Sequence, residues 1–307
     1  MSSQRHFAME SICVSAPPRT TTADWKSCLD EQQIPLIALS PIDEFYIKHE
    51  GLTALSGLMD QALRPELVSV LSDQLLLGYV SATELYFRRL LAVSARLCPE
   101  IRLHVADVEI PFGALDFYPR DQIEYALTEK ITLTEQGKVR NLLESRFGIP
   151  VSKLQNLQRA IEQFEKLCHL RHALVHSSGV VNSRNAHSLG HVGSRAICKV
   201  RLDVAELQLA ASVCMDLVRT VNDETAKHVL WTWLRGGHLK GQRTRDNSQL
   251  IKFLAAYASV SDVRLGAEHT SLEELHNLCK TVIRDMAASR LKDAEADASK
   301  GRVAVTT

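Results

Sequence analysis

An arginine and two histidines lie close together in the stretch Glu162–Asn182, at Arg171, His172 and His176. Histidine transfers protons near neutral pH, because the pKa of an unperturbed imidazole is about 6.5. The planar guanidinium of arginine binds phosphate oxygens in pairs. These residue types therefore suit a reaction in which protons move while a negative charge develops.

The same stretch is predicted to be an amphipathic helix. Its apolar residues Leu157, Ile161, Phe164 and Cys168 recur at steps of four, three and four, which is the spacing of one helix face. On a helical wheel Arg171 falls within roughly 20° of the centre of this face. A charge on a packing face is costly unless it is paired or used. We therefore expect Arg171 to serve a site or a dimer interface.

The helix is expected to end just after His176. Ser177, Ser178 and Gly179 follow, and glycine is typical of a helix C-terminus. On a regular helix the side chains of Arg171 and His176 would diverge by about 140°. We expect a loosened last turn, together with the reach of arginine, to bring both side chains into one cleft.

The pattern Arg171-x4-His176, with His172 directly after the arginine, resembles the motif of the HEPN superfamily. In that family the motif closes a long helix, and the residue after the arginine is typically Asn, Asp or His. The resemblance covers the middle of the chain, about residues 60 to 228. It implies a helical bundle, usually a homodimer, that cleaves RNA without a metal ion or another cofactor.

The resemblance also implies a reaction. The 2′-hydroxyl of RNA attacks the neighbouring phosphate, histidine acts as base and acid, and arginine stabilises the charged phosphorane. The products are a 2′,3′-cyclic phosphate and a 5′-hydroxyl. With one arginine–histidine set, a single histidine would have to act as both acid and base. The approach of two sites in a dimer would supply two histidines. Such nucleases often act as toxins or in phage defence, which implies an antitoxin or another defence component as a partner.

Each of these residues also has an ordinary structural interpretation. Arg171 could form an ion pair with a neighbouring helix, His176 could cap the helix C-terminus, and His172 could be an exposed helix residue. Glu84 is our candidate partner for Arg171 or His172, by resemblance to HEPN proteins with an acidic residue on an early helix. It could instead pair with Arg88, four residues away. The alternative function is a non-catalytic dimerisation or RNA-binding module, or a helical scaffold.

Four cations that could bind RNA gather between residues 231 and 245, at Arg235, Lys240, Arg243 and Arg245. Trp231 and Trp233 precede them and could stack on bases. Lys+Arg and Asp+Glu both number 36, so contacts to a nucleic acid must come from a local patch of this kind. The alternative is a solvated loop between helices.

The remaining composition favours a reduced protein of the cytoplasm. None of the seven cysteines forms a C-x-x-C pair, and cysteines in such proteins serve mainly as small apolar residues. We expect no signal peptide and no membrane-spanning segment. His187 and His191 have the spacing of helical metal ligands, but a third ligand is missing and their surroundings predict a loop, so we expect no metal site.

The hydrophobic pattern predicts an all-α bundle. Its core helices are expected at about 66–97, 134–146, 153–176 and 203–228, within a HEPN-like domain over residues 61–228. Further helices are expected at about 120–130, 248–260 and 271–291, and an extended insertion at about 101–111. Serine or aspartate three residues before glutamine or glutamate predicts capping boxes at Ser152, Asp203 and Ser271. We expect an N-terminal extension over 23–60, with a short helix at about 24–31 and an extended segment at about 34–39. We also expect a C-terminal helical extension over 229–292 and flexible tails over 1–22 and 293–307.

Overall fold

The computed structural model describes residues 25–29, 39–60, 64–191, 193, 196–266 and 270–303, with side chains in the last range described up to 289. The chain divides into two compact units, Met1–Ile34 and Pro35–Thr307. In the first unit, the 3₁₀ helix η1 (Trp25–Cys28) lies where the sequence predicts a short helix over 24–31. The extended segment expected over 34–39 lies, except for Leu39, outside the described residues.

The second unit is all-α, as the hydrophobic pattern predicts; among the described residues no strand forms. Its longer helices are α2 (Pro41–Ser56), α3 (Pro65–Leu97), α7 (Gln155–Ser177), α9 (Val204–Arg235), α10 (Arg243–Tyr257) and α12 (Leu272–Val303). Its short α-helices are α4 (Pro99–His104), α5 (Ala114–Phe117), α6 (Lys138–Leu142), α8 (Ser183–Ser188) and α11 (Val260–Arg264). The other turns are the 3₁₀ helices η2 (Gly57–Asp60), η3 (Arg120–Thr128) and η5 (Val151–Lys153) and the π-helical η4 (Leu143–Phe147).

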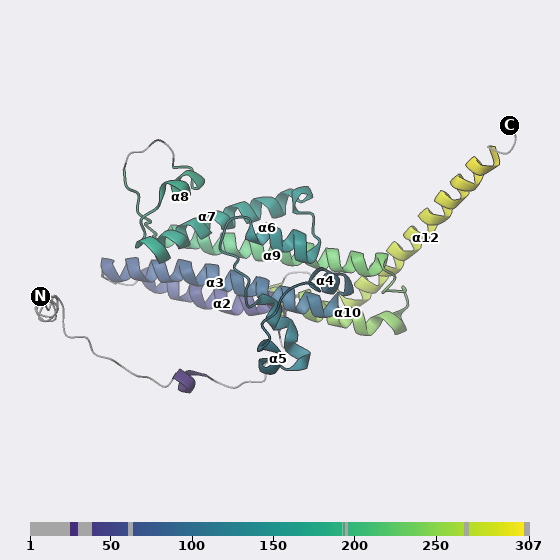
Figure 1. The fold of residues 1–307 in the computed structure, drawn as a ribbon, viewed down its shortest axis with the longest axis horizontal. Coiled ribbons are helices and arrows are strands. Elements are labelled where there is room, and N and C mark those ends of the chain that lie inside the picture. The colour runs from purple at the N-terminus through teal and green to yellow at the C-terminus, as the bar shows by residue number, and fades with distance from the viewer. Residues whose placement is uncertain are drawn as a thin grey trace, which may run out of the picture. The chain divides into compact units, whose positions relative to one another are not determined.

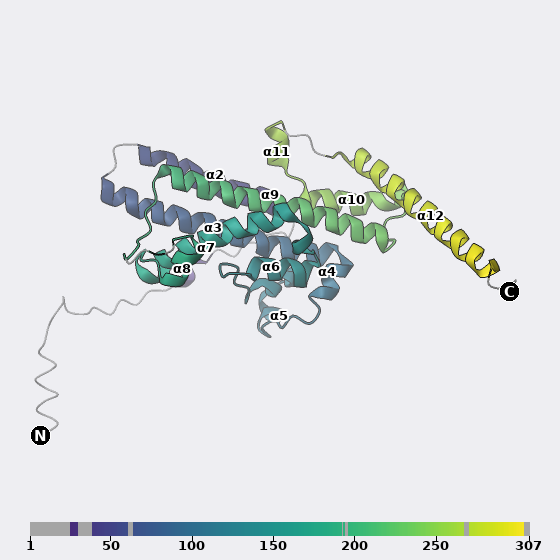
Figure 2. The same cartoon turned by 90° about the horizontal axis from the view of Figure 1, so that it is seen from above.

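Helix α3 is the centre of the bundle. It packs against α2, α7 and α9, and these four helices run alongside one another in Figures 1 and 2. Leu76, Phe87 and Leu90 are fully buried on it, because apolar residues broaden its face to more than one side. The helix begins at Pro65 and ends just before Pro99, since proline fits the first turn of a helix but breaks its interior. The predicted helix over 66–97 is thus confirmed.

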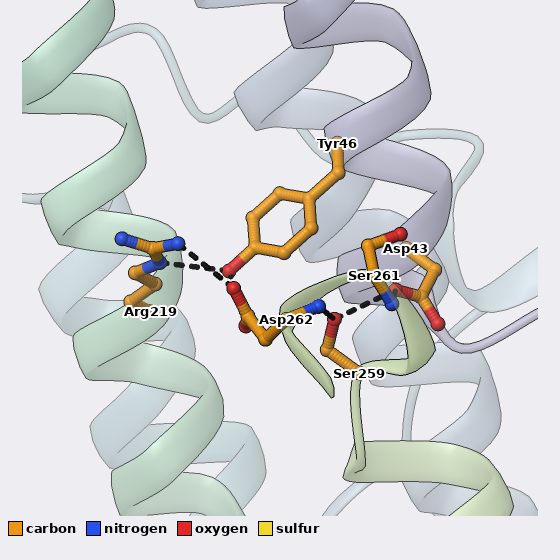
Figure 3. Close-up of polar contacts among 6 residues, drawn as sticks. All are labelled: Asp43, Tyr46, Arg219, Ser259, Ser261 and Asp262. Carbon is orange, nitrogen blue, oxygen red and sulfur yellow. Dashed lines mark hydrogen bonds and ion pairs between the residues drawn. The ribbon is translucent and has the colours of Figure 1, made fainter. Parts of the chain in front are cut away.

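A polar network ties the first helix of this unit to its C-terminal part (Figure 3). The buried carboxylate of Asp43 on α2 accepts hydrogen bonds from the Ser259 hydroxyl (2.8 Å) and from the backbone N–H groups of Val260 (3.0 Å) and Ser261 (3.2 Å). The Ser40 hydroxyl donates a further bond of 2.9 Å. Burial alone would raise the pKa of Asp43, but these hydrogen bonds together lower it. Asp43 therefore holds the start of α11 against α2 as an anion.

The second half of the network joins α2, α9 and α11. The Tyr46 hydroxyl donates to Asp262 (2.8 Å) and accepts from Arg219 (2.8 Å), and Arg219 pairs with Asp262 at 2.9 Å. Burial, opposed by Arg219 and reinforced by Asp262, raises the pKa of Tyr46 to about 12. The phenol therefore stays protonated at neutral pH, and it can donate and accept at the same time.

Two expectations about local structure are wrong. The insertion at 101–111 is not an extended segment, because Ile101–His104 belongs to α4, residues 105–107 form a turn, and residues 108–111 have no regular secondary structure. Ile101 and Val105 are buried and Leu103 is 74% exposed, so the apolar residues follow a helical period rather than the alternation of a strand. The capping box at Ser152 does not form either, since fully buried Val151 sets a 3₁₀ turn there and α7 begins at Gln155 without a side-chain cap.

The other two capping boxes are confirmed. Asp203 and Glu206 satisfy each other's backbone N–H groups at the start of α9, and Ser271 and Glu274 do the same before α12. Helices α9 and α12 both continue beyond their predicted ends, to Arg235 and Val303.

Candidate functional site

Helix α7 ends where the sequence predicts. Ser177 is its last residue, Ser178 and Gly179 follow with φ of 50° and 84°, and the N–H of Gly179 donates to the Ala173 carbonyl at 2.9 Å. Glycine adopts a positive φ at position 179 without strain, whereas Ser178 takes up the same left-handed region as a non-glycine residue. The turn redirects the chain, so that Val180 forms an antiparallel bridge with Lys199.

This bridge closes a loop that carries α8 alongside α7. The N–H of Val181 donates to the Cys198 carbonyl at 2.9 Å, and that of Val200 to the Gly179 carbonyl at 2.8 Å. Helix α8 corrects the expected loop over 183–194, because Asn182 caps its start through a 2.8 Å bond from the N–H of Asn185. Helices α7 and α8 therefore pack together beside the end of the arginine–histidine motif.

The two histidines of the motif lie side by side. The ring centroids of His172 and His176 are 4.7 Å apart, at an interplanar angle of 50°, because residues four apart share a helix face. Both side chains are exposed, and neither forms a hydrogen bond with a described residue. The capping interpretation of His176 is therefore not observed among the described residues.

Arg171 does not lie at the centre of a packing face, as the helical wheel predicts. Its side chain is half-buried, Val175 is 45% exposed, and Ala173 is buried instead. Towards its end, α7 thus turns a different side to the core. Arg171 forms no hydrogen bond or ion pair with any residue that the structure describes, so the structural ion pair is not observed there.

Helix α7 stays α-helical through Ser177, which corrects the expected loosened last turn. Side chains at positions 171 and 176 of a regular helix leave it about 140° apart. The structure therefore brings His172 and His176 together, and it shows no contact between Arg171 and either imidazole. A ligand that contacts all three groups would have to span this edge of α7.

Glu84 contacts other groups than the ones expected from the resemblance. Its carboxylate pairs with Arg88 at 3.1 Å and accepts a 3.2 Å bond from the N–H of Leu133. Arg88 in turn donates to the carbonyls of Thr128 and Ile131. Glu84 and Arg88 therefore fasten residues 128–133 to α3, which matches the intrahelical pairing kept as the alternative.

An open cavity of about 340 Å³ lies beside His172. It is lined by Cys168, His169 and His172 of α7, by Thr134, Glu135 and Gln136, and by Asn182, Arg184 and Asn185. The sequence did not indicate that His169, Arg184 and Asn185 line this cavity. His169 is three residues before His172 and could have been found from the helical spacing. No sequence pattern indicated that α8, which carries Arg184 and Asn185, would pack here. Burial raises the pKa of the Cys168 thiol, so this cysteine stays protonated and is not the nucleophile.

A larger cavity of about 860 Å³ lies elsewhere, near α4 and η3. Its walls carry Arg96 and Arg102, and both pair with Glu124, at 3.4 and 3.8 Å. Both arginines thus share a carboxylate partner within the protein, whereas Arg171 has no described partner, so we place the candidate site at the motif instead. The side chains of His187 and His191 contribute to no cluster of three or more potential metal ligands among the described residues.

The predicted basic cluster lies at the surface, at the junction of α9 and α10. Arg235, Lys240, Arg243 and Arg245 are all exposed. The buried carboxylate of Asp246 accepts bonds from the N–H groups of Lys240 (3.0 Å) and Gln242 (3.1 Å), which fixes the connecting loop.

The stacking role expected for Trp233 is wrong. This side chain is fully buried, and its ring packs on Phe253 with centroids 5.9 Å apart. Trp231, two residues earlier on α9, is 49% exposed. Only Trp231 of this pair presents its ring at the surface, because residues two apart on a helix point to opposite sides.

Reversing both Arg243 and Arg245 to glutamate tests whether this surface binds RNA. If it does, the slope of log K against log salt concentration should fall by about 1.4, since each lost contact to a single strand removes about 0.7. Fluorescence anisotropy over a salt series measures this slope, and Arg264→Glu on α11 is the control for an exposed arginine elsewhere. An unchanged slope would assign the cluster to an ordinary solvated surface.

Compared with models of protein families, with curated proteins and with solved structures, the chain matches none of them. Of the helices in the described part of the chain, none has the length and apolar character needed to cross a membrane.

Proposed function

We propose that this protein is a HEPN-like endoribonuclease that cleaves RNA without a metal ion. The 2′-hydroxyl attacks the adjacent phosphorus, one imidazole of the His172–His176 pair removes the hydroxyl proton, and the other protonates the leaving 5′-oxygen. The guanidinium of Arg171 binds the non-bridging oxygens of the phosphorane. The products carry a 2′,3′-cyclic phosphate and a 5′-hydroxyl.

The observation that carries this proposal is the distance of 4.7 Å between the two exposed imidazole rings. The reaction needs a base and an acid at one phosphate, and a single copy of the chain holds two such groups next to each other. The proposal therefore does not depend on the dimer that the resemblance implies. Arg171 precedes His172 in the sequence and leaves α7 on a different side; it has no described partner that would neutralise its charge, so it is available to a ligand that spans this edge of the helix.

The test is incubation of the purified full-length protein with RNA in the presence of EDTA. We expect fragments that end in a 2′,3′-cyclic phosphate, identified by mass spectrometry, and no cleavage of the same RNA carrying 2′-O-methyl groups. The methylated RNA is the matched control, because it retains the phosphates and lacks only the nucleophile. Loss of cleavage in EDTA, or cutting of the methylated RNA, would contradict the mechanism.

A non-catalytic RNA-binding module is the second candidate, and one observation favours it. No described residue forms a hydrogen bond with either imidazole, whereas catalytic histidines are usually oriented by a third group. In this function the motif and the basic cluster would bind RNA without cutting it. RNA that is bound but remains intact after long incubation would favour the module over the nuclease.

A further inference from the structure

The cavity beside His172 places base-reading groups next to the proposed site of cleavage. Three side-chain amides lie on its walls, from Gln136, Asn182 and Asn185, together with the carboxylate of Glu135. We propose that this cavity binds the base of the nucleotide adjoining the cleaved phosphate, and that it gives the enzyme a base preference. The inference rests on the proposed function insofar as it takes single-stranded RNA as the ligand.

Asn185, which lines the cavity, has a side-chain amide nitrogen that is unpaired in the described part of the chain. Its side chain is buried, with 6% exposed, and its side-chain nitrogen has no hydrogen-bond partner among the described residues. An unpaired buried amide costs about 1–3 kcal/mol, and native proteins keep few such groups. This nitrogen is closed to solvent, so the acceptor on the edge of a base would bond to it only after the side chain turned toward the cavity; asparagine and glutamine read bases through such bonds.

Two flat side chains, an imidazole and a guanidinium, flank these amides. His169 is half-buried and Arg184 is exposed, and neither forms an ion pair or a side-chain hydrogen bond with a described residue. Unpaired RNA bases are commonly stacked on histidine rings and guanidinium planes while their edges are hydrogen-bonded. The cavity therefore offers both kinds of contact that hold an unstacked base.

The wall of the cavity also holds an acceptor for the amino group of a base. The carboxylate of Glu135 lies in the same wall, and Lys138 pairs with it at 3.5 Å on the exposed surface. A carboxylate accepts hydrogen bonds from the amino groups of bases. The volume of about 340 Å³ is at the lower end for small-molecule sites, which suits one nucleotide rather than a longer segment.

The test measures the base preference of the enzyme before and after substitution of cavity residues. The substituted residues are exposed, so they can be changed without disturbing the core. Short RNAs with each of the four bases beside one cleavable position are cut by the parent protein, by Arg184→Ala and by Gln136→Ala. We expect the parent to favour one base, and each variant to reduce this preference by about 5- to 150-fold. Arg264→Ala on α11 is the control and should keep the preference of the parent.

Binding of the same four RNAs to the full-length His176→Ala protein separates this inference from the proposed function. If the parent cuts RNA but no base is preferred and Arg184→Ala changes nothing, the cavity assignment is overturned and the nuclease stands. If the parent does not cut, but base-dependent binding is lost in Arg184→Ala/His176→Ala, the cavity assignment stands and the nuclease falls. If RNA is neither cut nor bound, both are overturned.

Discussion

His176→Ala is expected to slow RNA cleavage by about 10²–10⁴-fold, the usual cost of removing a positioned acid or base. The fold should be unaffected, because the imidazole is exposed and has no described hydrogen bond, and such surface changes are usually within about 0.5 kcal/mol. Gel assays give the rates, and circular dichroism with a thermal scan checks the fold. The matched control is His104→Ala, an exposed histidine on α4, which should cut at the rate of the parent.

Substitutions of Arg171 test in the same way whether its guanidinium stabilises the charge of the phosphorane. Arg171→Ala should lower the rate to a similar extent, and Arg171→Lys should be nearly as slow, because an ammonium keeps the charge but loses the fork that binds two phosphate oxygens. A His176→Ala protein that cuts as fast as the parent would remove histidine from the mechanism. Full activity in Arg171→Lys would show that only a positive charge is needed at this position.

Asp43→Ala is expected to destabilise the fold by about 3–5 kcal/mol, because four neutral donors lose a charged acceptor and each hydrogen bond to a charged group contributes about 1.5–3 kcal/mol. The variant leaves the N–H groups of Val260 and Ser261 and two hydroxyls without their acceptor. Each unsatisfied group in the interior costs about 1–3 kcal/mol. Urea denaturation followed by circular dichroism measures the loss. Asp223→Ala, an exposed aspartate paired with Lys227, should change stability by less than about 0.5 kcal/mol.

The destabilisation in Asp43→Ala should depend on pH in one direction. The hydrogen bonds lower the pKa of Asp43 in the folded protein, so the carboxylate stabilises the fold at pH values above its unfolded pKa of about 3.9. This contribution is lost as pH falls through the lower, folded pKa. The difference in unfolding free energy between parent and variant should therefore be constant near neutral pH and shrink in acid. A difference that grows in acid would mean that Asp43 is not held as an anion.

The helices could be predicted from the sequence because their signals are local. Pro65 and Pro99 bound α3, Gly179 ends α7, and Asp203 with Glu206 starts α9. Each signal acts through the geometry of the residues beside it. The local signal failed at Ser152. Val151 is fully buried in a 3₁₀ turn there, and the capping box does not form.

The site was harder to predict, since contacts between helices depend on tertiary packing. The sequence predicted that Arg171 and His176 would meet, whereas the structure brings His172 and His176 together. Nothing in the spacing indicated that α8 would lie beside them with Arg184 and Asn185. Glu84 was assigned by resemblance, whereas its partners Arg88 and Leu133 follow from the path of residues 128–133 across α3. The half-buried state of Arg171 likewise depends on how the end of α7 packs.

The pH dependence of cleavage in EDTA tests most directly whether the two imidazoles act as base and acid. The rate constant divided by KM is measured from about pH 5 to pH 9, and an essential base and an essential acid give a bell-shaped profile. We predict that bell for the parent protein, and the loss of one of its two limbs, with a lower maximum, in His172→Ala. A profile that keeps both limbs and its full height in His172→Ala would contradict the account, because the pair of histidines at the end of α7 would then not be the catalytic pair.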